Sequence, residues 1–152
     1  LISGDALWED GFGIIFGELL GNPGALAATR RTLDMLAGLR VDTVIPGHGA
    51  PFDDVDSAIA RAYKRLAAFE NDPSRMARNA IKACFVFNLL DLEGLPRTEL
   101  EAYLGRVPFF RDVGVRQLGM DVPMLAGWLL SELKRAGAIA IEGDAIVPTM
   151  AA

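Results

Sequence analysis

The sequence predicts an α/β fold over residues 1–52, followed by a mostly helical part over residues 53–152. Two apolar runs end at glycines, "LISGD" at 1–5 and "VDTVIPGHG" at 41–49, and each predicts a buried strand. A helical pattern lies between them, and a strand–helix–strand order with short loops is typical of a layered α/β fold. From residue 53 on, apolar side chains recur every three or four residues, which predicts helices.

The segment between the two predicted strands contains a second apolar run and then a helix. The run "FGIIF" at 12–16 is partly β-branched, and "GNPG" at 21–24 is typical of a turn that starts a helix. Asn22 is expected to cap this helix and Pro23 to occupy its first position, since proline fits there without losing a hydrogen bond. The helix is expected to extend to about Leu39.

The first half of the second part is predicted to form two long helices. The segment 53–70 has one apolar stripe, made by Val55, Ile59, Ala62, Leu66 and Phe69. A second helix is expected from about Ser74 to Leu90, after Asn71-Asp72-Pro73. Its end, "CFVFNLL", is apolar nearly all round, which predicts the centre of a small core.

The last third is predicted to end in a helix and a hairpin. "TELE" at 98–101 fits a capping box of Thr98 and Glu101, and the segment 106–119 is less regular. Asp121 and Pro123 open a helix that is expected to end at Gly137. Two short apolar runs around "EGD", within 138–148, predict a β-hairpin. Three helices followed by a hairpin are the outline of a winged-helix-like module.

Composition limits the classes of partner. The net charge is −5, and neither part has the excess of basic residues that binding to a phosphate backbone requires, so a nucleic-acid partner is not expected. The single cysteine, Cys84, excludes an internal disulfide and favours a reducing cytoplasm. No apolar run is long enough to span a bilayer, so no membrane partner is expected.

The chain opens on residues that are typical of a core strand. Leu1 stands where a methionine would be expected, and Leu1 with Ile2 is typical of the middle of a buried strand. This predicts that the chain is the C-terminal part of a longer protein. If residues 1–52 fold without a covering half, their apolar strand edges should be exposed. Exposed edges of this kind favour association, so a homo-oligomer is the expected partner besides a small-molecule substrate.

The chemical candidates are the residues that follow the two predicted strands. Asp5 ends the first strand, and His48, the only histidine, lies in the Pro-Gly loop that ends the second. Ligands collect at strand ends in layered α/β folds, and a carboxylate with an imidazole suits a cation such as zinc. From the residues alone, a turn at Gly4-Asp5 and a structural role for His48 are the more common interpretations, and the metal site is the alternative to them.

A resemblance gives these residues a specific role. "SGDALWEDGFGIIF", followed by a helix and then "DTVIPGHGAPF", resembles the C-terminal half of the metallo-β-lactamase superfamily of metal-dependent hydrolases. The resemblance covers residues 1–52 and implies the C-terminal portion of an αββα sandwich. It implies a dinuclear zinc site in which Asp5 bridges the two ions and His48 binds the second. A metal-bound hydroxide would then attack an ester, thioester, amide or phosphoester.

The chain departs from the family pattern in its histidines. The family carries a His-x-His-x-Asp-His segment and a further histidine before the Gly-Asp, whereas this chain has one histidine in all. A catalytic zinc has three protein ligands, and Asp5 with His48 supplies two. We therefore expect an enzyme in the longer protein, and expect this chain alone to hold little or no zinc and to be inactive. No residue of the chain is assigned a catalytic role from its sequence.

Two aromatic residues and the helical part complete the predictions. Trp8 and Phe12 follow Asp5 on the side where the family places its substrate, so both are candidates for the pocket wall, with core packing as the alternative. The helical part resembles the helical or winged-helix-like extensions of some family members. An alternative function for the chain is that of a winged-helix-like module for protein interaction or oligomerisation, with nucleic-acid binding the less expected use.

Overall fold

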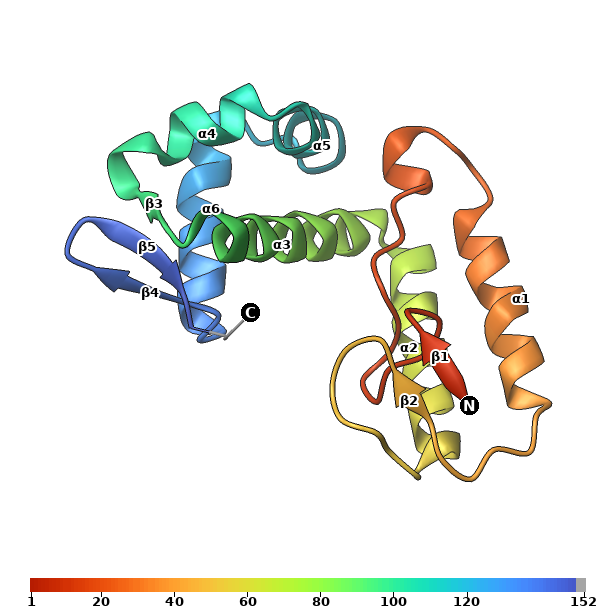
Figure 1. Ribbon diagram of the computed structural model, residues 1–152. Coiled ribbons are helices and arrows are strands. Elements are labelled where there is room, and N and C mark those ends of the chain that lie inside the picture. The colour runs from red at the N-terminus through yellow and green to blue at the C-terminus, as the bar shows by residue number, and fades with distance from the viewer. Residues whose placement is uncertain (150–152) are drawn as a thin grey trace. The chain divides into compact units, whose positions relative to one another are not determined.

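Six α-helices and five short strands form the part of the chain that the computed structural model describes, residues 1–149 (Figure 1). The fold is therefore mixed α/β and mostly helical, as the sequence predicts in general terms. The chain divides into two compact units between Met76 and Ala77. Within residues 1–149, no helix is long and apolar enough to cross a membrane.

The first unit is built on a parallel pair of short strands, β1 (Ile2–Gly4) and β2 (Ile45–Pro46), which pair with Ile2 opposite Ile45. The 3₁₀ turn η1 (Glu18–Leu20) and helix α1 (Ala25–Ala37) connect them, so the predicted order of strand, helix and strand is confirmed. The apolar run 12–16 forms no strand.

The prediction that β1 and β2 are buried strands is wrong for this chain. Ile2 is 81% exposed and Ile45 is 49% exposed. Val44, directly before β2, is fully buried, so burial is confined to part of the predicted second strand. Association through the exposed apolar residues stays a prediction.

The start of α1 differs from the prediction. Neither Asn22 nor Pro23 lies at the cap: the N-cap is Gly24, which makes no side-chain cap hydrogen bond. The carboxylate of Glu18 instead accepts hydrogen bonds from the backbone N–H groups of Gly24 at 2.9 Å and Leu26 at 3.1 Å. A carboxylate from the preceding turn therefore satisfies the open N–H groups at the helix start.

Helix α2 (Val55–Asn71) has the predicted apolar stripe, and it packs against α1. Arg30 of α1 pairs with Glu70 at 2.6 Å, and the Tyr63 hydroxyl donates to Asp34 at 2.6 Å. The hydrogen bond to Asp34 raises the pKa of Tyr63. Helix α2 therefore belongs with α1 to the first compact unit, which extends to Met76, and the predicted domain boundary at 52/53 stays a prediction.

The second unit, described as far as residue 149, combines helices with a small antiparallel sheet. Its sheet has the strand order β3-β5-β4. Phe85, in the predicted "CFVFNLL" core, is fully buried and contacts the rings of Tyr103 and Phe110. The elements are α3 (Pro73–Leu92), whose residues 73–76 belong to the first unit, β3 (Leu95–Pro96), the 3₁₀ turn η2 (Arg97–Glu99), α4 (Leu100–Arg106), α5 (Pro108–Leu118), α6 (Val122–Arg135), β4 (Ile139–Glu142) and β5 (Ala145–Pro148).

Two local predictions in the second unit are wrong. The capping box of Thr98 and Glu101 is absent, because α4 begins at Leu100 after η2 and has no side-chain cap. The segment 106–119, expected to be irregular, contains helix α5. Gly114 interrupts the apolar pattern of α5 because α6 passes so close that a Cβ there would lie 2.9 Å from Leu125 Cδ2.

Gly127 in α6 provides a test of helix propensity in this unit. It is exposed in the helix interior, and a Cβ added there would meet no atom within 4 Å. Gly127→Ala is therefore expected to stabilise the second unit by about 0.5–1 kcal/mol, because alanine loses less conformational freedom on folding. Urea denaturation followed by Trp128 fluorescence measures the change. Gly114→Ala should lower the stability of the second unit. A loss of stability from both substitutions would contradict the prediction for Gly127.

Candidate functional site

The structure brings Asp5 and His48 together, although they are 43 residues apart in the sequence. Asp5 follows β1 and His48 follows β2, and parallel strands end at the same edge of a sheet. The Gly47 N–H donates to the Gly4 carbonyl at 2.8 Å, which ties the two loops together. As a result, His48 Nε2 lies 3.8 Å from Asp5 Oδ1, with both side chains more than half exposed.

Two glycines allow the loops to approach Asp5. A Cβ at Gly47 would lie 3.0 Å from Asp5 Oδ1 and 3.0 Å from the Gly4 carbonyl carbon. A Cβ at Gly13 would lie 2.8 Å from Asp5 Cβ, and the Gly13 N–H donates to the Asp5 carbonyl at 2.8 Å. The backbone of Gly13 and Gly47 therefore lies directly against Asp5, and neither glycine position has room for a side chain.

Trp8 lies directly beside His48. The two rings meet edge to face, with centroids 5.1 Å apart and planes at 73°. The indole N–H donates to the Gly4 carbonyl at 3.2 Å, which fixes the ring against the end of β1. Of the two predicted pocket residues, Trp8 is thus part of the arrangement around Asp5 and His48.

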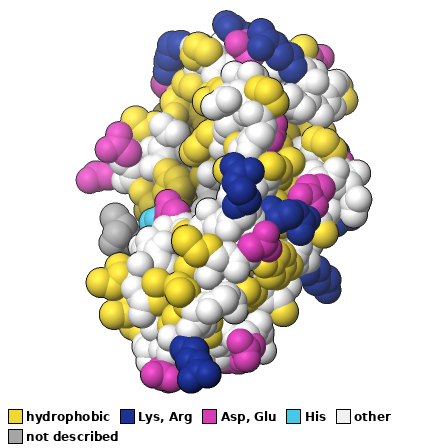
Figure 2. Space-filling model, turned by 90° about the vertical axis from the view of Figure 1, so that its right-hand side faces the viewer, with side chains coloured by type: hydrophobic (Ala, Val, Ile, Leu, Met, Phe, Trp, Pro, Cys, Tyr) yellow, Lys and Arg dark blue, Asp and Glu magenta, His cyan; other side chains and the backbone are white. Residues whose placement is uncertain are grey.

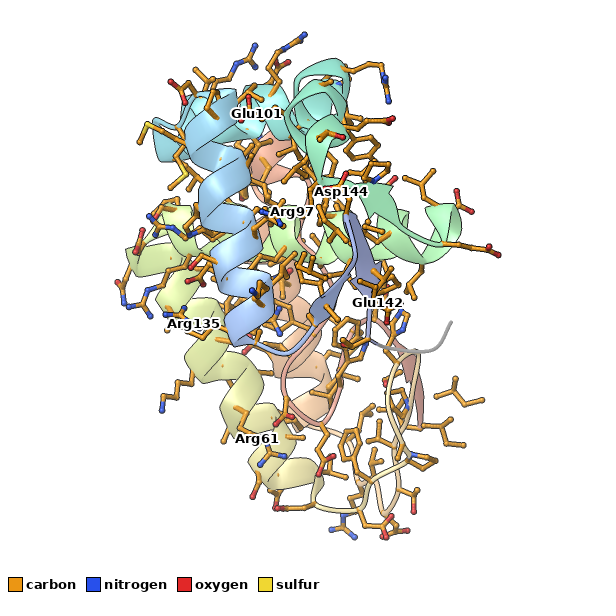
Figure 3. All side chains as sticks on the ribbon, turned by 90° about the vertical axis from the view of Figure 1, so that its left-hand side faces the viewer. Arg61, Arg97, Glu101, Arg135, Glu142 and Asp144 are labelled. Carbon is orange, nitrogen blue, oxygen red and sulfur yellow. The ribbon has the colours of Figure 1, made fainter. Side chains whose placement is uncertain are left out.

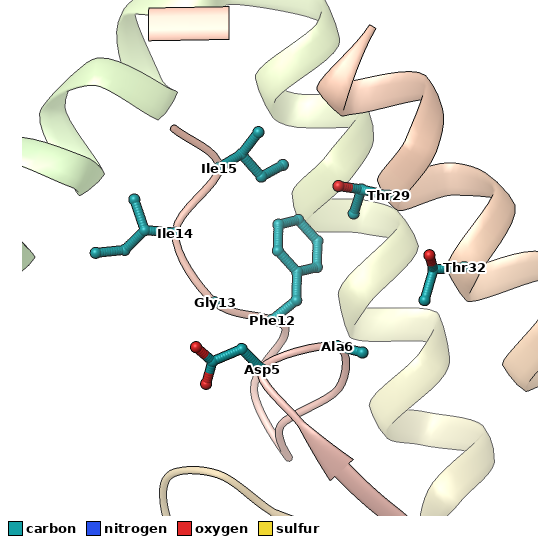
Figure 4. A pocket seen from close by; sticks show the side chains of 8 residues that line it. All are labelled: Asp5, Ala6, Phe12, Gly13, Ile14, Ile15, Thr29 and Thr32. Atoms are coloured by element: carbon teal, nitrogen blue, oxygen red, sulfur yellow. The ribbon is translucent and has the colours of Figure 1, made fainter. Parts of the chain in front are cut away.

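Phe12, the other predicted pocket residue, is a core residue. Only 2% of its surface is exposed, and its ring packs against Phe69 with centroids 6.1 Å apart. One edge of Phe12 also borders a cavity of about 160 Å³ between the loop after Asp5 and α1 (Figure 4). The cavity is lined by Asp5, Ala6, Phe12, Gly13, Ile14, Ile15, Thr29 and Thr32.

The cavity and the carboxylate of Asp5 do not form one polar site. In Figure 4 the Asp5 carboxylate points away from Thr29 and Thr32. Both threonine hydroxyls donate to backbone carbonyls within α1, at 3.0 Å and 3.1 Å. The chemistry available at this place is therefore that of Asp5 and His48.

Two arginines of α2, which the sequence analysis did not single out, hold the turn that carries Trp8. Arg61 Nε donates to the Glu9 carbonyl at 2.7 Å and lies 3.6 Å from the Asp10 carboxylate. The Arg65 guanidinium lies over the Phe12 ring at 5.1 Å. Burial lowers the pKa of Arg65. Their spacing of four residues puts both on one face of the helix, but this spacing alone gives no sign of the turn that they contact.

Asp5 and His48 fit a cation as two members of a larger set. Two ligands at zinc distances in a tetrahedral arrangement lie about 3.4 Å apart. The observed 3.8 Å between Oδ1 and Nε2 is close to this value. Across residues 1–149, no group of three or more His, Cys, Asp or Glu side chains could hold a metal ion. The donor chemistry therefore suits zinc, but a complete site needs ligands beyond these two.

Cys84, a free cysteine, lies on α3 within the second unit. Burial raises the pKa of its thiol, which favours the unreactive thiol over the thiolate. The comparisons with known proteins give no match to this chain among family models, curated proteins or solved structures.

Proposed function

We propose that this chain is the C-terminal part of a metal-dependent hydrolase of the metallo-β-lactamase superfamily, with zinc as the metal. The observation that carries the proposal is the approach of Asp5 and His48 to 3.8 Å across the ends of β1 and β2. The parallel pairing and the helical crossover between these strands support the C-terminal portion of an αββα sandwich.

In this proposal, the residues of the chain hold and orient the cation. Bound zinc supplies a Lewis acid and lowers the pKa of water, which is the chemistry needed to cleave an ester, thioester, amide or phosphoester. Asp5 would bridge two ions and His48 would bind the second, while Gly13 and Gly47 leave room for the Asp5 side chain. The remaining ligands would come from a segment outside residues 1–149, so this chain alone is expected to bind zinc weakly.

The topology of the second unit supports a winged-helix-like extension. Its order is helix, strand, three helices and hairpin, with β3 pairing to β5. Arg97 lies near the hairpin turn, on the same surface as Glu101 and Asp144 (Figure 3). This surface therefore carries both basic and acidic side chains. Figure 2, which faces the side of Figure 1 on which α1 of the first unit lies, also shows charges of both signs interspersed. This mixture favours a protein partner over nucleic acid.

The zinc proposal predicts that Asp5 and His48 bind the ion together. A titration with Zn²⁺ should perturb the imidazole proton signals of His48, which are unambiguous because the chain has one histidine. Asp5→Ala is expected to weaken this binding at least about tenfold, since one of two ligands is lost. Isothermal titration calorimetry gives the affinity for each variant.

Asp42→Ala is the matched control, because Asp42 is an exposed carboxylate in the loop before β2 and should leave Zn²⁺ affinity unchanged. Equal Zn²⁺ affinity in the wild type and in Asp5→Ala would rule out the ligand role of Asp5. In a longer protein that joins this chain to a His-x-His-x-Asp-His segment, Asp5→Ala should also abolish most of the turnover.

A further inference from the structure

The turn at residues 8–11 is held from outside by helix α2. The turn closes on itself, since Trp8 N–H donates to the Gly11 carbonyl at 2.7 Å. Arg61 reaches it with a hydrogen bond to the Glu9 carbonyl at 2.7 Å and a longer ion pair to Asp10 at 3.6 Å. A charge-assisted bond to a backbone carbonyl fixes the position of the turn itself, whichever way its exposed side chains point.

Arg65, one helical turn further along α2, closes the other side of the turn. Its guanidinium carbon lies over the ring of Phe12 at 5.1 Å and over the ring of Phe69 at 5.5 Å. It passes so close to Gly11 that a Cβ there would lie 2.9 Å from both Cδ and Nη1 of Arg65. Stacking on two rings restricts a side chain that is otherwise flexible, so Gly11 rests against a rigid surface.

The turn at residues 8–11 fixes the position of Trp8, and Trp8 contacts His48. The backbone of Trp8 is held by its pairing to Gly11. The indole is held by its ring N–H, which donates to the Gly4 carbonyl. Its ring then packs edge to face on the His48 imidazole at 5.1 Å. A continuous series of contacts therefore connects α2, through the turn and Trp8, to His48.

We propose that Arg61 and Arg65 are positioning residues that, through Trp8, set the orientation of the His48 imidazole beside Asp5. This inference rests on the proposed function, in which His48 binds a metal ion. The His48 side chain is 56% exposed, and the Trp8 indole is one of the groups that contact its ring. A ligand that is already oriented loses less conformational freedom when the ion binds, which raises affinity.

The test uses the ring current of Trp8 on the single histidine. The Cδ2–H and Cε1–H signals of His48 are recorded without metal at one fixed pH, well above the ordinary histidine pKa of about 6.5. Trp8→Leu defines the positions of these signals when the indole is absent. Arg61→Ala and Arg65→Met are expected to move them part of the way to those positions. Arg65→Met keeps an unbranched side chain over the two rings, which protects the fold.

Two further variants show that the effect is specific. Arg30→Ala removes the ion pair with Glu70 elsewhere in the first unit and should leave the His48 signals in place. Arg61→Lys keeps a cationic donor for the Glu9 carbonyl and should restore most of the wild-type signal positions. In Zn²⁺ titrations, Arg61→Ala is expected to lower affinity about tenfold, as is usual for groups that orient a metal ligand.

The outcomes separate this inference from the proposed function. If the His48 signals of Arg61→Ala and Arg65→Met coincide with those of the wild type, the two arginines do not position the ring. The inference is also overturned if Arg30→Ala moves the His48 signals as far as Arg61→Ala and Arg65→Met do. If the wild type binds no Zn²⁺, the proposed function fails, while the imidazole signals still show whether the arginines orient His48.

Discussion

Replacing Phe85 with alanine is expected to cost the second unit about 3–5 kcal/mol, the largest loss of stability predicted for a single substitution in this chain. Phe85 is fully buried, and its ring meets those of Tyr103 and Phe110 at centroid distances of 6.2 Å. Truncation removes both contacts and leaves a cavity that rigid neighbouring helices cannot fill. Since a domain of this size is stable by only about 5–15 kcal/mol, much of the second unit should unfold at moderate urea concentration.

Helix α3 contains its own control for this experiment. Phe87 lies two positions after Phe85 and is 45% exposed, so Phe87→Ala should cost less than about 1 kcal/mol. Urea denaturation followed by Trp128 fluorescence, in a Trp8→Phe background, reports the second unit alone because Trp128 is then the only tryptophan. Equal losses from the two substitutions would show that Phe85 is not at the centre of this core.

Gly47→Ala is expected to disturb both the stability of the first unit and the metal affinity. The new Cβ would lie 3.0 Å from Asp5 Oδ1, 3.0 Å from the Gly4 carbonyl carbon and 3.1 Å from the Gly4 oxygen. Two of these neighbours are backbone atoms and cannot rotate away, so β1 and β2 must move apart. We expect a loss of about 1–3 kcal/mol, typical of overpacking, and a fall in Zn²⁺ affinity of at least about tenfold.

Gly38→Ala is the matched control for Gly47→Ala. Gly38 has a φ of −83°, and a Cβ there would meet nothing closer than 3.5 Å. It should leave both stability and Zn²⁺ affinity close to the wild type. Urea denaturation followed by Trp8 fluorescence, with calorimetric Zn²⁺ titration, measures both effects. Wild-type affinity in Gly47→Ala would mean that the loop can shift without displacing Asp5.

The helices that the sequence predicts well are those with an uninterrupted apolar stripe. Helices α2, α3 and α6 and the β4–β5 hairpin follow from periodicity and turn residues, because each buries one face. Helix α5 was missed because Gly114, required by the close approach of α6, breaks its pattern. The cap of α1 was missed because Glu18 acts from a preceding turn, outside the usual capping position.

The candidate site was predictable only in part, because some of its contacts join segments that are far apart in the sequence. Asp5 and His48 could be paired from the sequence because both follow predicted strands, and strand ends converge. The roles of Arg61 and Arg65 could not, since they depend on where α2 meets a turn some fifty residues earlier. In the sequence of a helix, an arginine that donates to a distant carbonyl has the same pattern as an arginine that faces solvent.

The carboxylate of Glu18 has a consequence for the anions that this chain can accept. The N-terminus of a helix is a natural binding place for phosphate or carboxylate groups of a ligand. At α1, the N–H groups of Gly24 and Leu26 already bind an anion that belongs to the chain itself. An anionic ligand would have to displace the Glu18 carboxylate from these two N–H groups before it could bind them.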